Sequence, residues 1–255
     1  MKKISKIRKN KDKYEVILSG GESLSFYEQT IINYNLLKPR SIDDNLLKEI
    51  IEYNKVLEIY YEAIKFISIK MRSKKEIYLK FKNCNKTLLD KAIILLEEKG
   101  YINEEKYIEA YINDAINLTK KGPLKIKREL KSLGLSDSLI NEKIDSINKD
   151  IWTKRISKII MKKKNNKYSD YIFKEKLRVY LINLGYADYI NDEIFLDLDS
   201  NEKDIIMKEY TKQYNKLSSK YNGKELESKI KYNLYKKGYN KELINEILIN
   251  TRLNM

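Results

Sequence analysis

One motif recurs along this chain at a nearly constant spacing, and it constrains the fold more than any other feature. The recurring positions are Asn83, Gly134, Gly185 and Gly238, which lie 51, 51 and 53 residues apart. A leucine precedes each position by four residues, and these leucines are Leu79, Leu130, Leu181 and Leu234. A repeat of this length is typical of tandem supersecondary units that share hydrophobic cores. The sequence therefore predicts a repeat protein.

We interpret each recurring position as the end of a helix, where the backbone enters the left-handed region. Glycine adopts this region without steric cost, and asparagine tolerates it next best. Helix starts are indicated by capping boxes at Ser73 with Glu76 and at Thr87 with Asp90, by N-caps at Ser136, Asn201 and Asn240, and by Pro123 in a first turn. Three helices of about 12 to 16 residues then fit each module.

The N-terminal segment has a different pattern. Residues 14–18 and 23–27 are predicted to be two strands around a turn at Gly20 and Gly21, and residues 4–8 add a third strand. The pattern becomes helical over residues 27–37, and Ser41 with Asp44 is predicted to begin the next helix. A sheet this small is not stable alone, so we expect it to pack on the first module.

The predicted fold class is mainly α. About four three-helix modules of ~51 residues would form a curved, elongated array behind an N-terminal extension that contains a β-hairpin. The predicted division is a β-rich extension over residues 1–45, followed by modules over residues 46–100, 101–149, 150–199 and 200–255.

The residue inventory argues against catalysis. The chain has no histidine, which removes the commonest general base and metal ligand, and its one cysteine, Cys84, cannot form an intramolecular disulfide. The densest acidic cluster is Asp197, Asp199, Glu202 and Asp204, which we interpret as acids favoured near a helix N-terminus. No phosphate-binding loop or nucleophile motif occurs in the sequence. We therefore expect no enzyme activity, no metal and no cofactor.

The cellular location of the protein and the roles of its aromatic residues are indicated only in general terms by the sequence. No apolar run approaches the roughly 18 residues of a membrane span, and the N-terminus lacks the apolar stretch of a signal peptide. We expect a cytoplasmic monomer without membrane contact. Most of the 21 tyrosines are expected in core or boundary positions, including Tyr107, Tyr186 and Tyr239, with base-stacking platforms as the alternative. Trp152 is also expected in the core, with an interface anchor as the alternative.

The net charge of +15 is unevenly distributed. Residues 120–178 hold 18 Lys or Arg against 7 Asp or Glu, a net of +11, whereas residues 180–255 balance at 12 against 12. The candidate basic stripe comprises Lys120, Lys121, Lys125, Lys127, Arg128, Lys131, Lys154, Arg155, Lys158, Lys162, Lys163, Lys164, Lys167 and Arg178. Such a stripe suits an anionic polymer or an acidic protein groove. The alternative is the codon bias of an AT-rich genome, but bias alone would not confine the surplus to a quarter of the chain.

Several motifs together resemble one family, the RecX regulators of the RecA recombinase. The similar elements are Arg72-Ser73-Lys-Lys-Glu76, Leu88-Leu89, Gly100-Tyr101-Ile102-Asn103-Glu104-Glu105-Lys-Tyr107, Ala110-Tyr111, Lys121-Gly122, and Arg128-Glu129-Leu130 before Gly134. The N-terminal strands with Tyr34-Asn-Leu-Leu-Lys38 are similar to the extension of longer members. Two departures are Asn83 in place of the usual glycine and a fourth module.

The resemblance implies a non-enzymatic regulator that binds the RecA filament on single-stranded DNA, in its helical groove. There it would mainly inhibit filament growth or persistence, ATP hydrolysis, strand exchange and co-protease activity, within DNA repair and the SOS response. Two alternatives remain open. A direct DNA-binding protein would bind DNA tightly without RecA, and a repeat scaffold would bind some other protein.

Overall fold

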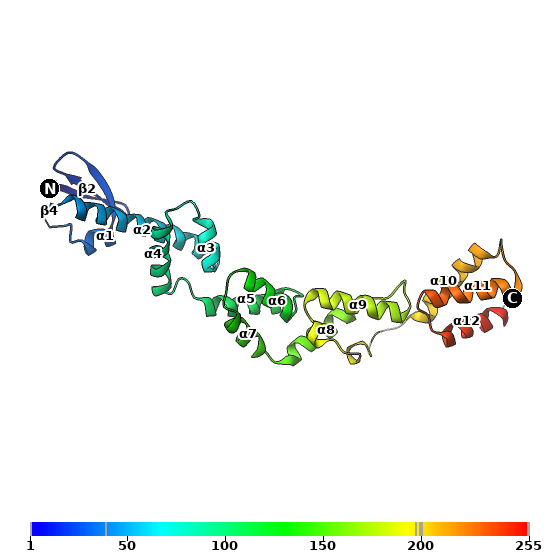
Figure 1. Cartoon of the computed structure of the whole chain (residues 1–255). Helices are drawn as coiled ribbons and strands as arrows, with labels where there is room; N and C mark the ends of the chain where they lie inside the picture. Colours follow the sequence, from blue (N-terminus) through cyan, green and yellow to red (C-terminus); the bar gives the residue numbers. More distant parts are fainter. Residues whose placement is uncertain (1, 39, 197, 199–200, 254–255) are drawn as a thin grey trace. The chain divides into compact units, whose positions relative to one another are not determined.

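The computed structural model describes residues 2–38, 40–196, 198 and 201–253, and most of them are helical (Figure 1). The chain divides into two compact units. Unit 1 comprises Met1–Ala110 and Lys131–Leu139, and unit 2 comprises Tyr111–Leu130 and Ile140–Met255. The mainly α class with a small N-terminal sheet is thus confirmed, whereas the division into one extension and four modules stays a prediction.

The sheet in unit 1 is antiparallel and has the strand order β3-β2-β1-β4. Its strands are β1 (Lys2–Asn10), β2 (Lys13–Leu18), β3 (Ser23–Tyr27) and β4 (Ser41–Ile42). The predicted hairpin turn at Gly20 and Gly21 is confirmed, and Gly21 has a φ of 79°. The short β4 was not predicted. Ser41 therefore does not begin a helix; Asp43 does, because its side chain accepts a hydrogen bond from the Leu46 amide.

Two helices cover this sheet, α1 (Glu28–Asn33) and the long α2 (Asp44–Ile69). Apolar residues from the strands, α1 and the first half of α2 form one core, which comprises Val16, Leu18, Phe26, Ile31, Leu36, Ile42, Leu47 and Ile50. A buried amide on α2 joins the layers, since Asn54 accepts hydrogen bonds from the Tyr27 amide (2.9 Å) and the Thr30 hydroxyl (3.0 Å). The extension therefore packs on α2, the first helix of the predicted first module, as expected.

The second half of α2 packs with α3 (Lys74–Lys80) and α4 (Lys86–Glu98). The capping box at Ser73 and Glu76 is confirmed. The one predicted at Thr87 is wrong, because Asn85 caps α4 and Thr87 lies inside the helix. The predicted helix length is also wrong here, since α2 has 26 residues and α3 has 7.

The first of the four recurring positions does not behave as predicted. Asn83 has no positive φ, because α3 ends at Lys80 and Phe81 occupies the C-cap with a φ of −103°. The associated Leu79 is 61% exposed, since this short helix buries Ile77 instead.

The other three positions follow the prediction. Gly134, Gly185 and Gly238 have φ values of 77°, 93° and 83°. Their associated leucines, Leu130, Leu181 and Leu234, are fully buried. Each glycine therefore ends a helix whose last inward-facing leucine anchors it in a core.

The remaining helices run through the rest of the chain. They are α5 (Glu104–Leu118), α6 (Pro123–Ser132), α7 (Asp137–Asp145), α8 (Lys149–Met161), α9 (Asp170–Leu184), α10 (Glu202–Leu217), α11 (Gly223–Lys236) and α12 (Lys241–Leu253). Pro123 begins α6 as predicted, and Asn240 caps α12 through the Leu243 amide. Ser136 directly precedes α7, whereas the Asn201 side chain makes no capping hydrogen bond.

The third predicted module departs from three regular helices. After α9 the described residues form two short 3₁₀ turns, η1 (Ala187–Tyr189) and η2 (Glu193–Phe195). Of the acidic cluster, Glu202 and Asp204 lie in the first turn of α10, where acids stabilise the helix. Asp197 and Asp199 lie outside the described residues.

Unit 2 contains one very close backbone contact, between Gly122 and Gly185. The Gly122 amide donates to the Leu184 carbonyl at 2.6 Å, and the Leu124 amide donates to the Gly185 carbonyl at 3.1 Å. A Cβ added to Gly122 would lie 2.7 Å from the Gly185 backbone. Glycine at position 122 thus lets the turn before α6 dock on the end of α9.

The aromatic residues assigned to the core are confirmed there. Tyr107, Tyr186, Tyr239 and Trp152 are all buried. The Tyr186 ring lies 6.3 Å from the Trp152 ring in an edge-to-face arrangement. Trp152 and Tyr186 thus support α8, because Trp152 lies on that helix and the Tyr186 hydroxyl accepts a hydrogen bond from Arg155.

Candidate basic interface

One face of α8 lines a surface groove of about 490 Å³ in unit 2, which we name the α8 groove. Its other wall is the end of α5 and the turn that follows. The lining residues are Ile116, Asn117, Thr119, Lys120, Ile151, Lys154, Arg155, Lys158, Ile159 and Lys162. Residues three and four apart share a helix face, so the spacing of the α8 residues places their side chains along one stripe.

Four lysines give the α8 groove its charge. Lys120, Lys154, Lys158 and Lys162 are all exposed. Within the described ranges, no carboxylate lies within ion-pair distance of any of the four. The groove therefore presents uncompensated positive charge above an apolar floor of Ile151 and Ile159.

Arg155 has a different role from its lysine neighbours. Its guanidinium donates to the carbonyls of Ala115, Ile116, Thr119 and Lys121. The first two belong to the last turn of α5, whose carbonyls have no partner within the helix. Its Nε also donates to the Tyr186 hydroxyl at 3.1 Å. Arg155 thus caps α5 and fixes it against α8, rather than offering its charge to a ligand.

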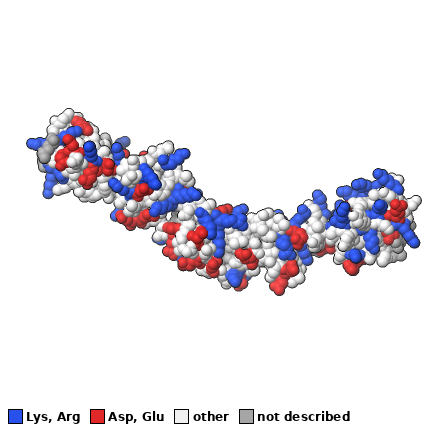
Figure 2. All heavy atoms as spheres, viewed as in Figure 1, with Lys and Arg blue, Asp and Glu red and all other residues white. Residues whose placement is uncertain are grey.

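Four further members of the predicted stripe form ion pairs within the chain. Lys121 pairs with Glu129, Lys127 with Asp145, Lys131 with Asp137, and Arg178 with both Asp192 and Glu175. Figure 2 shows acidic side chains among the basic ones around α6. The charge of these four residues is therefore partly compensated.

The ion pair between Lys121 and Glu129 shifts the pKa values of both side chains. The hydrogen bond to Glu129 raises the pKa of Lys121 above its ordinary value. Burial acts to raise the pKa of Glu129, but hydrogen bonds from Lys121 and the Tyr111 hydroxyl outweigh it and leave that pKa lowered. Both side chains stay charged at neutral pH and serve the fold.

The last five predicted residues lie outside the α8 groove. Lys125 is half-buried against Gly185, and Arg128 and Lys164 are exposed. Lys163 lies 4.4 Å from the centre of the Tyr180 ring, and Lys167 lies 5.8 Å from that of Tyr168. The structure therefore brings together only part of the predicted stripe, namely Lys120, Lys154, Lys158 and Lys162 with Arg155.

The internal role of Arg155 was missed at the sequence level, although one signal was present. The chain has seven arginines among its 52 basic residues, so an arginine in a lysine-rich helix is unusual. Arg72 shows the same behaviour, because it pairs with Glu76 and lies 4.0 Å from the Phe66 ring. Arginine has a planar fork that satisfies several acceptors at once, which lysine cannot do.

The comparisons with known proteins identify the family of this chain. The family "RecX, second three-helix domain" matches residues 103–144, the segment that holds α5, α6 and α7. The chain is 32% identical over 258 aligned residues to the regulatory protein RecX of Streptococcus agalactiae (strain NEM316), with 96% of this chain and 98% of that protein covered. The chain belongs to the RecX family. The RecX protein of Streptococcus uberis is 31% identical with the same coverage.

The fold of this chain is also similar to that of a solved structure. The crystal structure of a regulatory protein RecX superposes with a TM-score of 0.66 at 20% identity, covering 78% of this chain and 98% of that one. This likeness supports the mainly helical fold of this RecX family member. Among the described residues, no helix is long and apolar enough to cross a membrane. No group of three or more His, Cys, Asp or Glu in those ranges is arranged to hold a metal ion.

Proposed function

We propose that this protein regulates RecA by binding the RecA filament on single-stranded DNA, mainly as an inhibitor of filament growth or persistence. Membership of the RecX family over nearly the whole chain is the observation that carries this proposal. Reduced ATP hydrolysis, strand exchange and co-protease activity would follow, as would a role in DNA repair in the cytoplasm. The action is one of binding, without catalysis.

We propose the α8 groove as the principal contact surface. Its four exposed lysines lack acidic partners in the described part of the chain, so their charge is available to phosphates or to acidic side chains of a filament. The helix α8, which carries Lys154 and Lys158, is held against the end of α5 by Arg155 and is anchored by the buried Trp152. A preorganised basic surface loses little conformational entropy on binding.

The test is ATP hydrolysis by RecA on single-stranded DNA, measured with increasing amounts of this protein. The variant K154E/K158E/K162E reverses three charges along the α8 groove. Its control is K208E/K212E/K216E, which reverses three exposed lysines at the same i, i+4 spacing on α10 of the same unit. We expect the α8 variant to need at least about tenfold more protein for half-inhibition, and the α10 variant to behave as the wild type.

The stoichiometry separates regulation from competition for DNA. Inhibition at amounts well below those that cover the DNA supports contact with the filament. Inhibition that occurs only at saturation of the DNA contradicts it and favours direct DNA binding. Equal loss of inhibition in both triple variants would remove the α8 groove from the mechanism.

A further inference from the structure

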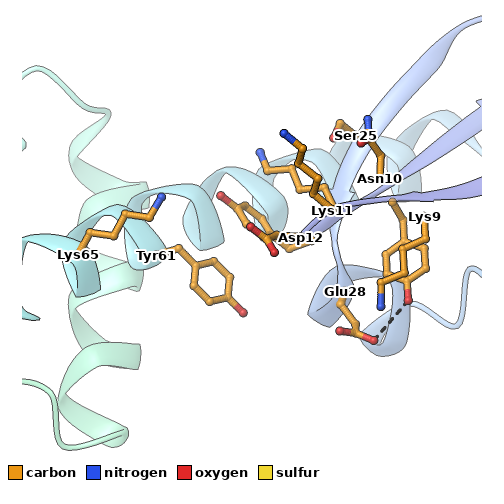
Figure 3. A pocket seen from close by; sticks show the side chains of 11 residues that line it. Lys9, Asn10, Lys11, Asp12, Ser25, Glu28, Tyr61 and Lys65 are labelled. Atoms are coloured by element: carbon orange, nitrogen blue, oxygen red, sulfur yellow. Dashed lines mark hydrogen bonds between the residues drawn. The ribbon is translucent and has the colours of Figure 1, made fainter.

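A second basic surface lies in unit 1, on the N-terminal extension. It is a hollow of about 750 Å³ between the β1–β2 turn and α2, which we name the extension hollow. Figure 3 shows Tyr61 and Lys65 on the α2 side, and Lys11 and Asp12 on the strand side. The other lining residues are Lys9, Asn10, Lys13, Tyr14, Ser25, Tyr27 and Glu28.

Three tyrosines supply aromatic surface to the extension hollow. The rings of Tyr27 and Tyr61 lie 4.6 Å apart and are tilted by 34°. Both residues are half-buried, and Tyr27 already has the Tyr61 ring against it and the Lys13 ammonium 4.3 Å from its ring centre. Tyr14 is held by a hydrogen bond from its hydroxyl to Glu28 at 3.3 Å. A flat ligand group could stack here on rings that are already fixed.

Four lysines surround these rings. Lys9 lies 5.5 Å from the centre of the Tyr14 ring and Lys13 lies 4.3 Å from that of Tyr27. Lys13 is paired with Glu58, but Lys11 and Lys65 are exposed and, among described residues, have no carboxylate at ion-pair distance. Two cations at the rim are therefore available to an anionic ligand.

The position of Lys11 in the turn has an energetic cost. It occupies the first place of a two-residue hairpin loop with a φ of +53°. Glycine or asparagine is favoured there, because other residues lose about 1 kcal/mol or more in this conformation. The turn thus places a lysine at the rim of the hollow, at a position whose backbone conformation favours glycine or asparagine.

We propose that the extension hollow binds single-stranded nucleic acid, with one base stacked on Tyr61 and the flanking phosphates on Lys11 and Lys65. Fixed aromatic rings beside mobile cations are the combination that single strands use, because every base has a face to stack and a phosphate next to it. A duplex offers no such exposed face in its interior. This site is independent of the α8 groove and of any contact with RecA.

Photocrosslinking locates the binding site. The full chain is irradiated with a short oligothymidylate that carries 5-iodouracil, and the crosslinked peptide is identified by mass spectrometry. Crosslinks to Tyr14, Tyr27 or Tyr61 support the proposal. Crosslinks that fall only on unit 2 would overturn it.

Fluorescence anisotropy then measures the contributions of base and phosphate. The oligothymidylate is compared with an abasic phosphodiester of the same length and with a poly-glutamate competitor. We expect the abasic strand to bind roughly tenfold more weakly. Equal binding of both strands would contradict stacking. Efficient displacement by poly-glutamate would indicate an acidic protein segment as the ligand instead.

Two pairs of variants test the lysines and Tyr61 of the extension hollow. Each variant is made in the wild-type chain and also in the K154E/K158E/K162E chain, in which the α8 groove no longer contributes to binding. K11E/K65E should lower affinity about tenfold and reduce the salt slope by about 1.4, at ~0.7 for each lost phosphate contact. Its control, K48E/K55E, reverses two exposed lysines elsewhere on α2 and should have no such effect. Y61F should bind as the wild type and Y61L should lose affinity, with circular dichroism verifying that both are folded. Equal effects of the two lysine pairs, or of the two Tyr61 variants, would refute the proposal.

Discussion

Replacing Arg155 by Met should destabilise unit 2 strongly, because this residue caps α5 rather than binding a ligand. The guanidinium donates to the carbonyls of Ala115, Ile116, Thr119 and Lys121 and to the Tyr186 hydroxyl. Each bond contributes about 0.5–1.5 kcal/mol net, the longer ones least. The positive charge at the helix C-terminus adds about 0.3–1 kcal/mol. Since the side chain is partly exposed, we expect a total loss of about 3 kcal/mol.

Urea denaturation followed by tryptophan fluorescence measures this loss. Trp152 is the single tryptophan of the chain, is buried, and lies in unit 2 near Arg155, so its emission reports the unfolding of this region. Arg155→Lys keeps the charge but reaches fewer carbonyls, and should lose about 1–2 kcal/mol. Lys158→Met is the control on the same helix and should change stability by less than about 0.5 kcal/mol. Equal stability of Arg155→Met and wild type would refute the capping role.

Three further predictions concern the fold. Gly122→Ala forces a Cβ to within 2.7 Å of the Gly185 backbone and should cost about 1–3 kcal/mol, measured by the same fluorescence method; a neutral effect would contradict the close contact. Asn54→Ala leaves the Tyr27 amide and the Thr30 hydroxyl without their partner, so the free energy of unfolding of unit 1, followed by circular dichroism, should fall by about 2–4 kcal/mol; an unchanged value would exclude Asn54 as the link. Burial acts to raise the pKa of Glu76, but hydrogen bonds from Ser73, Arg72 and Tyr107 outweigh it and lower that pKa. The resulting stabilisation is present above the ordinary value of 4.5 and is lost as pH falls through the folded-state pKa, so the advantage of wild type over Glu76→Gln should shrink on acidification; a pH-independent difference would contradict this.

The sequence predicts those parts of the fold that local chemistry decides. Gly134, Gly185 and Gly238 need a positive φ, and the leucine four residues earlier lies one turn back on the buried face, so both were identified from spacing alone. The hairpin was identified for the same reason, because the Gly20-Gly21 turn between two alternating segments has few other solutions.

Features that depend on tertiary contacts were not predictable in this way. Asn83 resembled the three glycines in spacing, but α3 ends three residues earlier, because its core contact is made by Ile77. Asn54 joins β3 and α1 through contacts more than 20 residues away. The third helix of the third predicted module is replaced by two 3₁₀ turns. The spacing of the recurring glycines gave no indication of this change.

The candidate site was partly predictable. The basic stripe was identified from charge density, which does not distinguish lysines that pair within the chain from those that do not. Lys127 forms an ion pair with Asp145, and this contact depends on how α6 packs against α7. Lys154, Lys158 and Lys162 lie together for a local reason, because residues four apart share a helix face. The distinction between them requires the three-dimensional structure.

The most direct test of the central claim is the rate of ATP hydrolysis by RecA on single-stranded DNA, titrated with the wild type, K154E/K158E/K162E and K208E/K212E/K216E. The account predicts inhibition by the wild type and by the α10 variant at amounts well below DNA saturation, and a loss of at least about tenfold in potency for the α8 variant. Inhibition that is equal for all three proteins, or that needs saturation of the DNA, would contradict the account.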